Sequence, residues 1–330
     1  MNGLVDKFGR RINYLRISVT DRCNFRCTYC MPEEGVRLES RLNILTFEEI
    51  TKIAQVAVAN GVTNIRLTGG EPLVRRDLPK LVYSLSAIPG LSDLSLTTNA
   101  SLLSKYAQTL ADSGLKRVNI SLDTVNPDTF HRITRFGALD DVWEGILAAE
   151  NAGFNPIKIN VVVMKGVNDQ ELLELAKITM NHPWQVRFIE LMPFEHNSGQ
   201  TGIMGIGDDL FFSVQEMKER LESLRMVPID KKSGGGPSRN FKIQGSLGTV
   251  GFISPIGDHF CSTCNRIRLT ADGKLRPCLL NDTEVMLREP LRRNEDILPY
   301  LVRAVEAKPE RHNLETSQLK LNRKMSQIGG

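Results

Sequence analysis

The sequence predicts an α/β protein built on a parallel sheet with helices outside it. Short β-branched runs recur along the chain, and stretches with helical periodicity separate most of them. Repeated strand–helix units of this kind form parallel sheets that are either doubly wound or closed toward a barrel. In both arrangements the reactive groups gather at the carboxyl ends of the strands. The predicted strands are Leu15–Val19, Asn64–Thr68, Leu94–Thr98, Arg117–Leu122, Ile157–Val163 and Gln185–Glu190.

Helices are expected between these strands. Thr46 and Glu49 form a capping box, which opens a helix that stops at Gly61. The same helical periodicity predicts the segments Ser101–Ser113, ended by Gly114, Asp140–Ala152 and Asn168–Met180.

The pattern changes near residue 195. The polar, glycine-rich stretch 197–208 predicts a loop, Ser213–Leu224 a helix, and the run 234–237 a break. Two hairpins are expected after it, Phe241–Ile253 and Arg266–Leu279, and the second turns at Asp272-Gly273. Residues 282–307 look helical, and residues 308–330 are expected to be flexible until something binds them.

Bulk composition excludes several classes of protein. The net charge of +4 is too small to indicate a nucleic-acid binder, although it suits an anionic substrate. No run of eighteen apolar residues predicts a membrane span, and residues 1–15 have no apolar signal segment, so a cytoplasmic protein is expected. Six cysteines in a chain of 330 residues do not make a secreted disulfide scaffold. Reduced thiols at close spacing are instead candidate metal ligands.

The first cysteine triplet follows the first predicted strand. Cys23, Cys27 and Cys30 have the spacing C-x₃-C-x₂-C. Three thiolates on one short loop can bind three corners of a 4Fe–4S cluster and leave the fourth iron open for a cofactor. Zinc sites use four protein ligands, or three plus water. A structural or zinc-binding triplet is the alternative interpretation.

This loop, with the aromatic Tyr29 directly before its last cysteine, resembles the hallmark of the radical S-adenosylmethionine (SAM) superfamily. The resemblance implies that the open iron binds the amino and carboxylate groups of SAM, and that a 5′-deoxyadenosyl radical abstracts a hydrogen atom from the substrate. It also implies SAM contacts from Tyr29, Gly70 in the motif Gly69-Gly70-Glu71-Pro72, Ser121 and Met192. The alternatives are a plain turn at the glycines and core packing of Met192.

The second triplet, Cys261, Cys264 and Cys278, has the spacing C-x₂-C-x₁₃-C. A second cluster with an open iron is the favoured interpretation. Zinc is the alternative, for which His259 would be a poorly placed fourth ligand. Strand alternation puts Arg266 and Arg268 on one face beside these cysteines, where a cationic pair can hold an anionic substrate. A solvated strand face is the alternative for this pair.

The radical SAM core, the second triplet with its N-R-I-R-L-T motif at 265–270, and the terminal Gly329-Gly330 resemble the GTP 3′,8-cyclase family, or molybdenum cofactor biosynthesis protein A, over essentially the whole chain. The resemblance implies an incomplete (β/α) TIM-type barrel closed by a C-terminal α+β extension. It divides the chain into a radical SAM partial barrel, 1–230, with the first 4Fe–4S cluster, and a C-terminal region, 231–330, with the second cluster and a flexible tail.

The same resemblance implies a lyase that makes (8S)-3′,8-cyclo-7,8-dihydroguanosine 5′-triphosphate from GTP, the first step of molybdenum cofactor biosynthesis. The radical removes the ribose 3′ hydrogen, C3′ attacks C8 of guanine, and the product radical is reduced through the second cluster. Catalytic roles are implied for Arg16, Arg266, Arg268, Gly329 and Gly330. The family's GTP-contacting positions are Arg16, Arg66, Thr97, Lys158, Arg266, Ile267 and Arg268, to which Arg187 is added as a further basic candidate.

The implied partners are GTP, an electron donor of flavodoxin or ferredoxin type, and a downstream cyclic pyranopterin monophosphate synthase; neither nucleic acid nor membrane is expected. The oligomeric state stays open, a homodimer included. Another two-cluster radical SAM enzyme, such as a peptide-modifying maturase, is the alternative within enzymes. An electron-transfer or zinc-stabilised binding protein is the alternative outside them, although two triplets that each lack one ligand argue against it.

Overall fold

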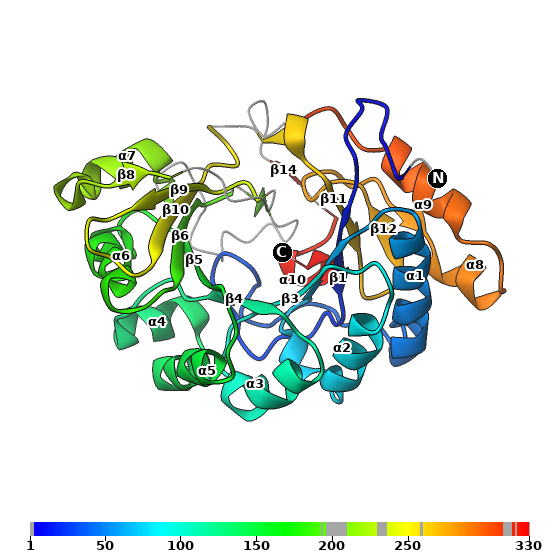
Figure 1. Ribbon diagram of the computed structural model, residues 1–330, viewed down its shortest axis with the longest axis horizontal. Helices are drawn as coiled ribbons and strands as arrows, with labels where there is room; N and C mark the ends of the chain where they lie inside the picture. The colour runs from blue at the N-terminus through cyan, green and yellow to red at the C-terminus, as the bar shows by residue number, and fades with distance from the viewer. Residues whose placement is uncertain are drawn as a thin grey trace.

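The computed structural model describes residues 3–192, 194–195, 210–229, 236–257, 260–312, 319–320 and 322–329. Figure 1 shows one strongly curved sheet with helices along its outer side and the C-terminal segment inside the curve. In this described part of the chain, no helix is long and apolar enough to cross a membrane.

All six predicted strands are confirmed, with ends shifted by at most one residue. They lie side by side in chain order and pair in parallel. Their bounds are β1 (Tyr14–Ser18), β2 (Asn64–Thr68), β3 (Asp93–Thr98), β4 (Arg117–Ser121), β5 (Ile157–Val163) and β6 (Gln185–Glu190).

The helices pack their apolar faces on the outer side of these strands. The capping box at Thr46 and Glu49 is confirmed, because each side chain accepts a hydrogen bond from the other residue's main chain. Three of the expected helices are confirmed within a few residues, and the last begins later because 169–171 form a 3₁₀ turn. The bounds are α1 (Phe47–Ala59), α2 (Leu78–Ser86), α3 (Leu103–Asp112), α4 (Pro127–Thr134), α5 (Leu139–Asn151) and α6 (Leu172–Asn181).

Both predicted C-terminal hairpins are confirmed, and they extend the sheet at opposite edges. Strands β9 (Arg239–Lys242) and β10 (Thr249–Ile253) join the β6 edge, and β8 (Val227–Pro228) pairs with β9. Strands β11 (Arg266–Leu269) and β12 (Lys274–Arg276) join the β1 edge, and β13 (Val285–Met286) follows them. The twelve-stranded sheet therefore runs from β13 to β8 as an incomplete barrel.

The helical prediction for residues 282–307 is partly wrong. That segment holds β13, α8 (Arg288–Arg292) and α9 (Leu298–Glu306). Val285 is buried and pairs with Leu275, so it is used in the sheet, and Asn294 at φ 58° separates the two helices. The expected helix after Ser213 is α7 (Val214–Arg220), which a 3₁₀ turn follows.

The C-terminal tail enters the curve of the sheet. Its β14 (Leu319–Lys320) pairs in parallel with β7 (Phe194–Glu195), and α10 (Met325–Ile328) lies inside the curve (Figure 1). The described part of the tail thus lies against the inner side of the sheet, and its expected flexibility stays a prediction. The predicted loop 197–208 and the residues 234–235 of the predicted break lie outside the described residues.

Candidate active site inside the incomplete barrel

The inward-facing positions of the strands bring the predicted substrate residues together. Arg16 stands opposite Arg66 on one side and Arg268 on the other. Continuing round the sheet, Asn119 stands between Thr97 and Lys158. Because side chains alternate along a strand, residues at these register positions share one face. The predicted residues whose side chains share this inner face are Arg16, Arg66, Thr97, Lys158, Arg187, Arg266 and Arg268.

Ile267 lies on the other face of β11. It pairs with Leu15, and both side chains belong to the hydrophobic core under the helices, with Ile267 1% exposed. Only its main chain could therefore face a ligand. The alternation of Arg266 and Arg268 already implied this, since the residue between them must point outward.

The inner face concentrates positive charge in a buried place. Burial, together with Arg187, Arg117 and Arg66, lowers the pKa of Lys158 to about 7. Burial and the neighbouring arginines also lower the pKa of Arg187 and of Arg268 to about 9. Crowded buried cations are unfavourable on their own. A polyanion bound here would relieve that cost.

Several polar atoms of this face also lack partners. Among the described residues, Thr97 Oγ1, Asn160 Oδ1 and Arg187 Nε are buried without a hydrogen bond. Arg187 donates its NH2 to Asn119 Oδ1 at 2.8 Å, so its orientation is fixed. Buried polar atoms are normally paired, and those that are not mark a place for a ligand or water. Asn119 and Asn160 are inward-facing residues that the sequence reasoning missed.

The first cysteine triplet lies on the loop after β1. Burial raises the pKa of Cys23 to about 11 and that of Cys30 to about 12, and it also raises the pKa of Cys27. Repulsion from Cys30 and Cys23 contributes to the shift of Cys27, and repulsion from Cys23 contributes to that of Cys30. Bound iron would supply the positive charge that lets them ionise. The Phe25 N–H lies 3.4 Å from Cys23 Sγ, a contact typical of cluster-binding loops.

Gly69 and Gly70 bring the end of β2 against this cysteine loop. Gly70 N–H donates to Thr20 O at 2.9 Å and Glu71 N–H to Arg22 O at 2.8 Å. A Cβ at Gly70 would lie 2.4 Å from Arg22 O, and one at Gly69 would lie 2.5 Å from Thr20 O. The glycines are therefore required for the close approach of two chain segments. This adds a structural role to the SAM contact predicted for Gly70.

Two buried carboxyl groups support this region, and the sequence reasoning assigned neither of them. Glu71 accepts hydrogen bonds from Thr98 Oγ1 (2.8 Å), Asn99 N (2.6 Å) and Leu73 N (2.9 Å). Burial raises its pKa to about 7. Asp123 accepts the Tyr29 hydroxyl at 2.7 Å, and burial raises its pKa to about 6. Tyr29, predicted to contact SAM, is thus held by the strand end after Ser121, another predicted SAM contact.

The second triplet lies where the β11 and β12 hairpin meets the N-terminal segment. Although burial opposes it, Arg266 and Lys308 lower the pKa of Cys264 to about 6. Burial, then Cys278 and Cys264, raises the pKa of Cys261. The Leu280 N–H lies 3.4 Å from Cys278 Sγ, which repeats the contact seen in the first loop. No three His, Cys, Asp or Glu side chains in the described ranges form a single-ion site.

Two buried cations tie this second loop to distant segments. Arg10 donates to Cys261 O (2.7 Å), Glu310 O (3.0 Å) and Pro309 O (2.6 Å), while Asp6 neutralises it. Lys308 Nζ donates to Arg266 O and Pro277 O, both at 2.8 Å. Neither residue was singled out from the sequence, because each acts through main-chain carbonyls remote in the chain.

The described end of the tail reaches both cysteine loops. Arg268 NH1 donates to Gly329 O at 2.7 Å, and the Ser326 main chain hydrogen-bonds the Cys30 thiol. Ile328 packs against Leu280, with Met192 beside them in the same small apolar cluster. The adenine contact predicted for Met192 stays a prediction, and Gly330 lies outside the described residues.

Comparisons with known proteins agree with this geometry. The profile of the Radical SAM superfamily matches residues 17–178, and that of Molybdenum Cofactor Synthesis C matches residues 184–314. A GTP 3′,8-cyclase of Moorella thermoacetica is 47% identical over 98% of this chain and 99% of its own. One of Heliobacterium modesticaldum is 48% identical over 99% of this chain and all of its own. The crystal structure of Streptococcus suis SuiB bound to S-adenosylmethionine has a TM-score of 0.61 at 16% identity, covering 96% of this chain and 78% of that one, so it shows the fold alone.

Proposed function

This chain belongs to the GTP 3′,8-cyclase family of radical SAM enzymes, which use two 4Fe–4S clusters and SAM in the first step of molybdenum cofactor biosynthesis, and we propose that its barrel interior binds GTP for removal of the ribose 3′ hydrogen. The observation that carries this proposal is the ring of buried cations on one face, together with polar atoms that lack partners. Such a site suits a polyanionic nucleotide.

The triphosphate is assigned to the cations on β2, β5 and β6. Arg66, Lys158 and Arg187 come from strands that bring them to one side of the barrel, and burial strengthens their attraction for phosphate. Thr97 Oγ1 is a further hydrogen-bonding group for the nucleotide. Arg16, Arg266 and Arg268 stand between this group and the second cysteine triplet, and we assign them to the reacting nucleoside with the main chain of Ile267.

The cysteines are assigned to the two clusters, with Cys23, Cys27 and Cys30 holding the first and Cys261, Cys264 and Cys278 the second. Tyr29, Gly70, Ser121 and Met192 are assigned to SAM. When bound, the first cluster and SAM supply the 5′-deoxyadenosyl radical that takes the 3′ hydrogen of GTP. The chain's part is to hold the ribose still and to exclude water, and we assign Gly329 and Gly330 to this task.

We also propose a division of the chain into two regions, and we propose two protein partners. We divide the chain into a barrel, 1–230, and a C-terminal region, 231–330, whose hairpins extend both sheet edges. An electron donor of flavodoxin or ferredoxin type and a downstream cyclic pyranopterin monophosphate synthase would complete the sequence of reactions. The donor would reduce the clusters, and the synthase would consume the cyclised nucleotide.

Isotope transfer tests the proposal. The anaerobic two-cluster enzyme would be given SAM and GTP deuterated at C3′, and the 5′-deoxyadenosine would be analysed by mass spectrometry. We expect one deuterium in that product, and none when the label is at C2′. Unlabelled 5′-deoxyadenosine from 3′-labelled GTP would refute hydrogen removal at C3′. Deuterium transfer from a peptide instead would favour the maturase alternative.

A further inference from the structure

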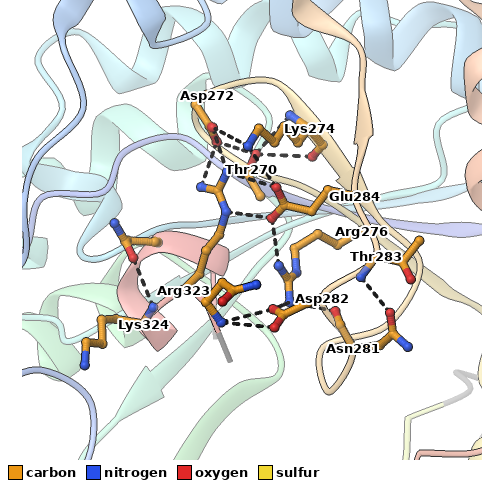
Figure 2. Close-up of polar contacts among 12 residues, drawn as sticks. Thr270, Asp272, Lys274, Arg276, Asn281, Asp282, Thr283, Glu284, Arg323 and Lys324 are labelled. Carbon is orange, nitrogen blue, oxygen red and sulfur yellow. Dashed lines mark hydrogen bonds and ion pairs between the residues drawn. The ribbon is translucent and has the colours of Figure 1, made fainter. Parts of the chain in front are cut away.

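We propose that Arg323, Asp272 and Glu284 form a latch that holds the C-terminal tail in the mouth of the barrel. Figure 2 shows the Arg323 guanidinium between the two carboxylates. The inference extends the proposed function, on which it rests only in taking the barrel interior as the reaction site. It identifies Arg323 as a positioning residue, which acts through the tail and touches no substrate.

The latch uses every nitrogen of the guanidinium. Arg323 NH1 and NH2 lie 3.0 and 2.8 Å from the two oxygens of Asp272. Its Nε lies 2.6 Å from Glu284 Oε1, and NH2 lies 3.2 Å from Glu284 Oε2. The three side chains are 11%, 8% and 18% exposed, so water screens these contacts much less than it screens surface pairs. Bidentate arginine–carboxylate pairs are among the strongest side-chain contacts.

The carboxylates of the latch are built into the sheet. Asp272 lies in the turn between β11 and β12 and also accepts the Thr270 hydroxyl at 2.6 Å. Glu284 accepts from Arg276, whose side chain is fully buried, at 2.7 Å. Beside them, the main-chain N–H of Asn322 donates to Asp282, with its nitrogen 3.2 Å from Oδ1 and 3.1 Å from Oδ2. The sheet thus presents a fixed acidic receptor to the residues just before α10 (Figure 2).

One hairpin holds the tail at two points. Its turn binds Arg323, and its strand β11 carries Arg268, which binds Gly329 O. Between these points the tail contacts the first cysteine loop through Ser326 and buries Ile328 to 1% exposure. Fixing a segment near one end raises the effective concentration of the rest at its binding site. Loss of the latch should therefore release the whole stretch 322–329.

Proteolysis of the anaerobic two-cluster enzyme tests the latch without depending on its chemistry. Cleavage after Lys324 by a lysine-specific protease releases the peptide 325–330, which mass spectrometry measures. We expect Arg323→Ala to raise the release rate about tenfold or more, because cleavage needs local opening of the tail. The exposed Arg311, changed to Ala, is the matched control and should leave the rate unchanged.

A release rate for Arg323→Ala equal to that of the unaltered enzyme would overturn the latch, as would an equal increase in Arg311→Ala. Glu284→Gln provides the second variant, and it should also speed release because one carboxylate is lost. The variants that release the peptide faster should form less cyclised nucleotide. If release responds as expected while GTP is not converted even by the unaltered enzyme, the latch stands and the reaction assignment fails.

Discussion

Lys158 shows what burial does to a single side chain in this site. Removal from water and the nearby arginines lower its pKa to about 7, so the unliganded protein holds it partly neutral at neutral pH. At pH values between about 7 and the ordinary pKa of a lysine, the folded chain binds fewer protons than the unfolded chain. Stability from this group is therefore gained as pH rises through that window and lost as pH falls through it.

The first prediction concerns this proton. A triphosphate beside Lys158 should restore its charge, so GTP binding at pH 8 should take up about one proton per chain, and affinity should weaken as pH rises. Calorimetry in buffers of different ionisation enthalpy measures the uptake. Lys158→Met should abolish it, while the exposed Lys52→Met should not. Uptake that persists in Lys158→Met would show that another group titrates.

The second prediction concerns Gly329. A Cβ there would lie 2.2 Å from Thr68 Oγ1, at a φ of 68° that favours glycine. Gly329→Ala should displace the tail and reduce formation of cyclised nucleotide by about tenfold or more, in line with a lost positioning contact. Gly166 is the matched control, because its φ is 70° and a Cβ there would meet nothing within 4 Å. Equal activity of the two alanine variants would show that crowding at Thr68 has no consequence.

At the scale of elements, the strands and cysteine loops could be predicted from the sequence, because their signals are local. The recurring β-branched runs placed Arg16, Arg66 and Lys158 on strands, and parallel register then brought them to one face. Arg10 and Lys308 could not be predicted in the same way. Their partners are carbonyls up to several hundred residues away, which no local pattern encodes. The helical expectation for residues 282–307 is wrong at Val285–Met286, because Val285 is used in the sheet.

The third prediction concerns Lys308, which joins β11 to the segment before Cys278. Lys308→Met would leave two buried carbonyls without a donor, at a cost of about 1–3 kcal/mol each. We expect iron to fall from about eight toward about four per chain as the second cluster becomes labile. Iron analysis and electron paramagnetic resonance of the anaerobic protein would measure this. Lys80→Met, at an exposed lysine, is the control. A full iron content in Lys308→Met would show that Lys308 does not stabilise the second cluster.

At the scale of the whole molecule, an open sheet with two added edges brings residues from distant parts of the sequence to one inner face. The β11 and β12 hairpin brings the second cysteine triplet to the start of β1, whereas the loop that carries the first triplet follows the end of that strand. The resemblance of the sequence to a family predicted this closure, whereas composition and periodicity alone left a doubly wound sheet equally open. The latch between Arg323 and the hairpin turn could be seen only in three dimensions, because it joins residues without a sequence signature.

We propose that the inner face of this sheet couples SAM cleavage to cyclisation of GTP. The most direct test of this coupling is anaerobic turnover of the reduced two-cluster enzyme with SAM and GTP, with 5′-deoxyadenosine and the cyclised nucleotide measured together. We expect the two products in equal amounts, and we expect Arg266→Ala to abolish the nucleotide product. Formation of 5′-deoxyadenosine at the same rate with and without GTP, with no cyclised nucleotide, would contradict the account.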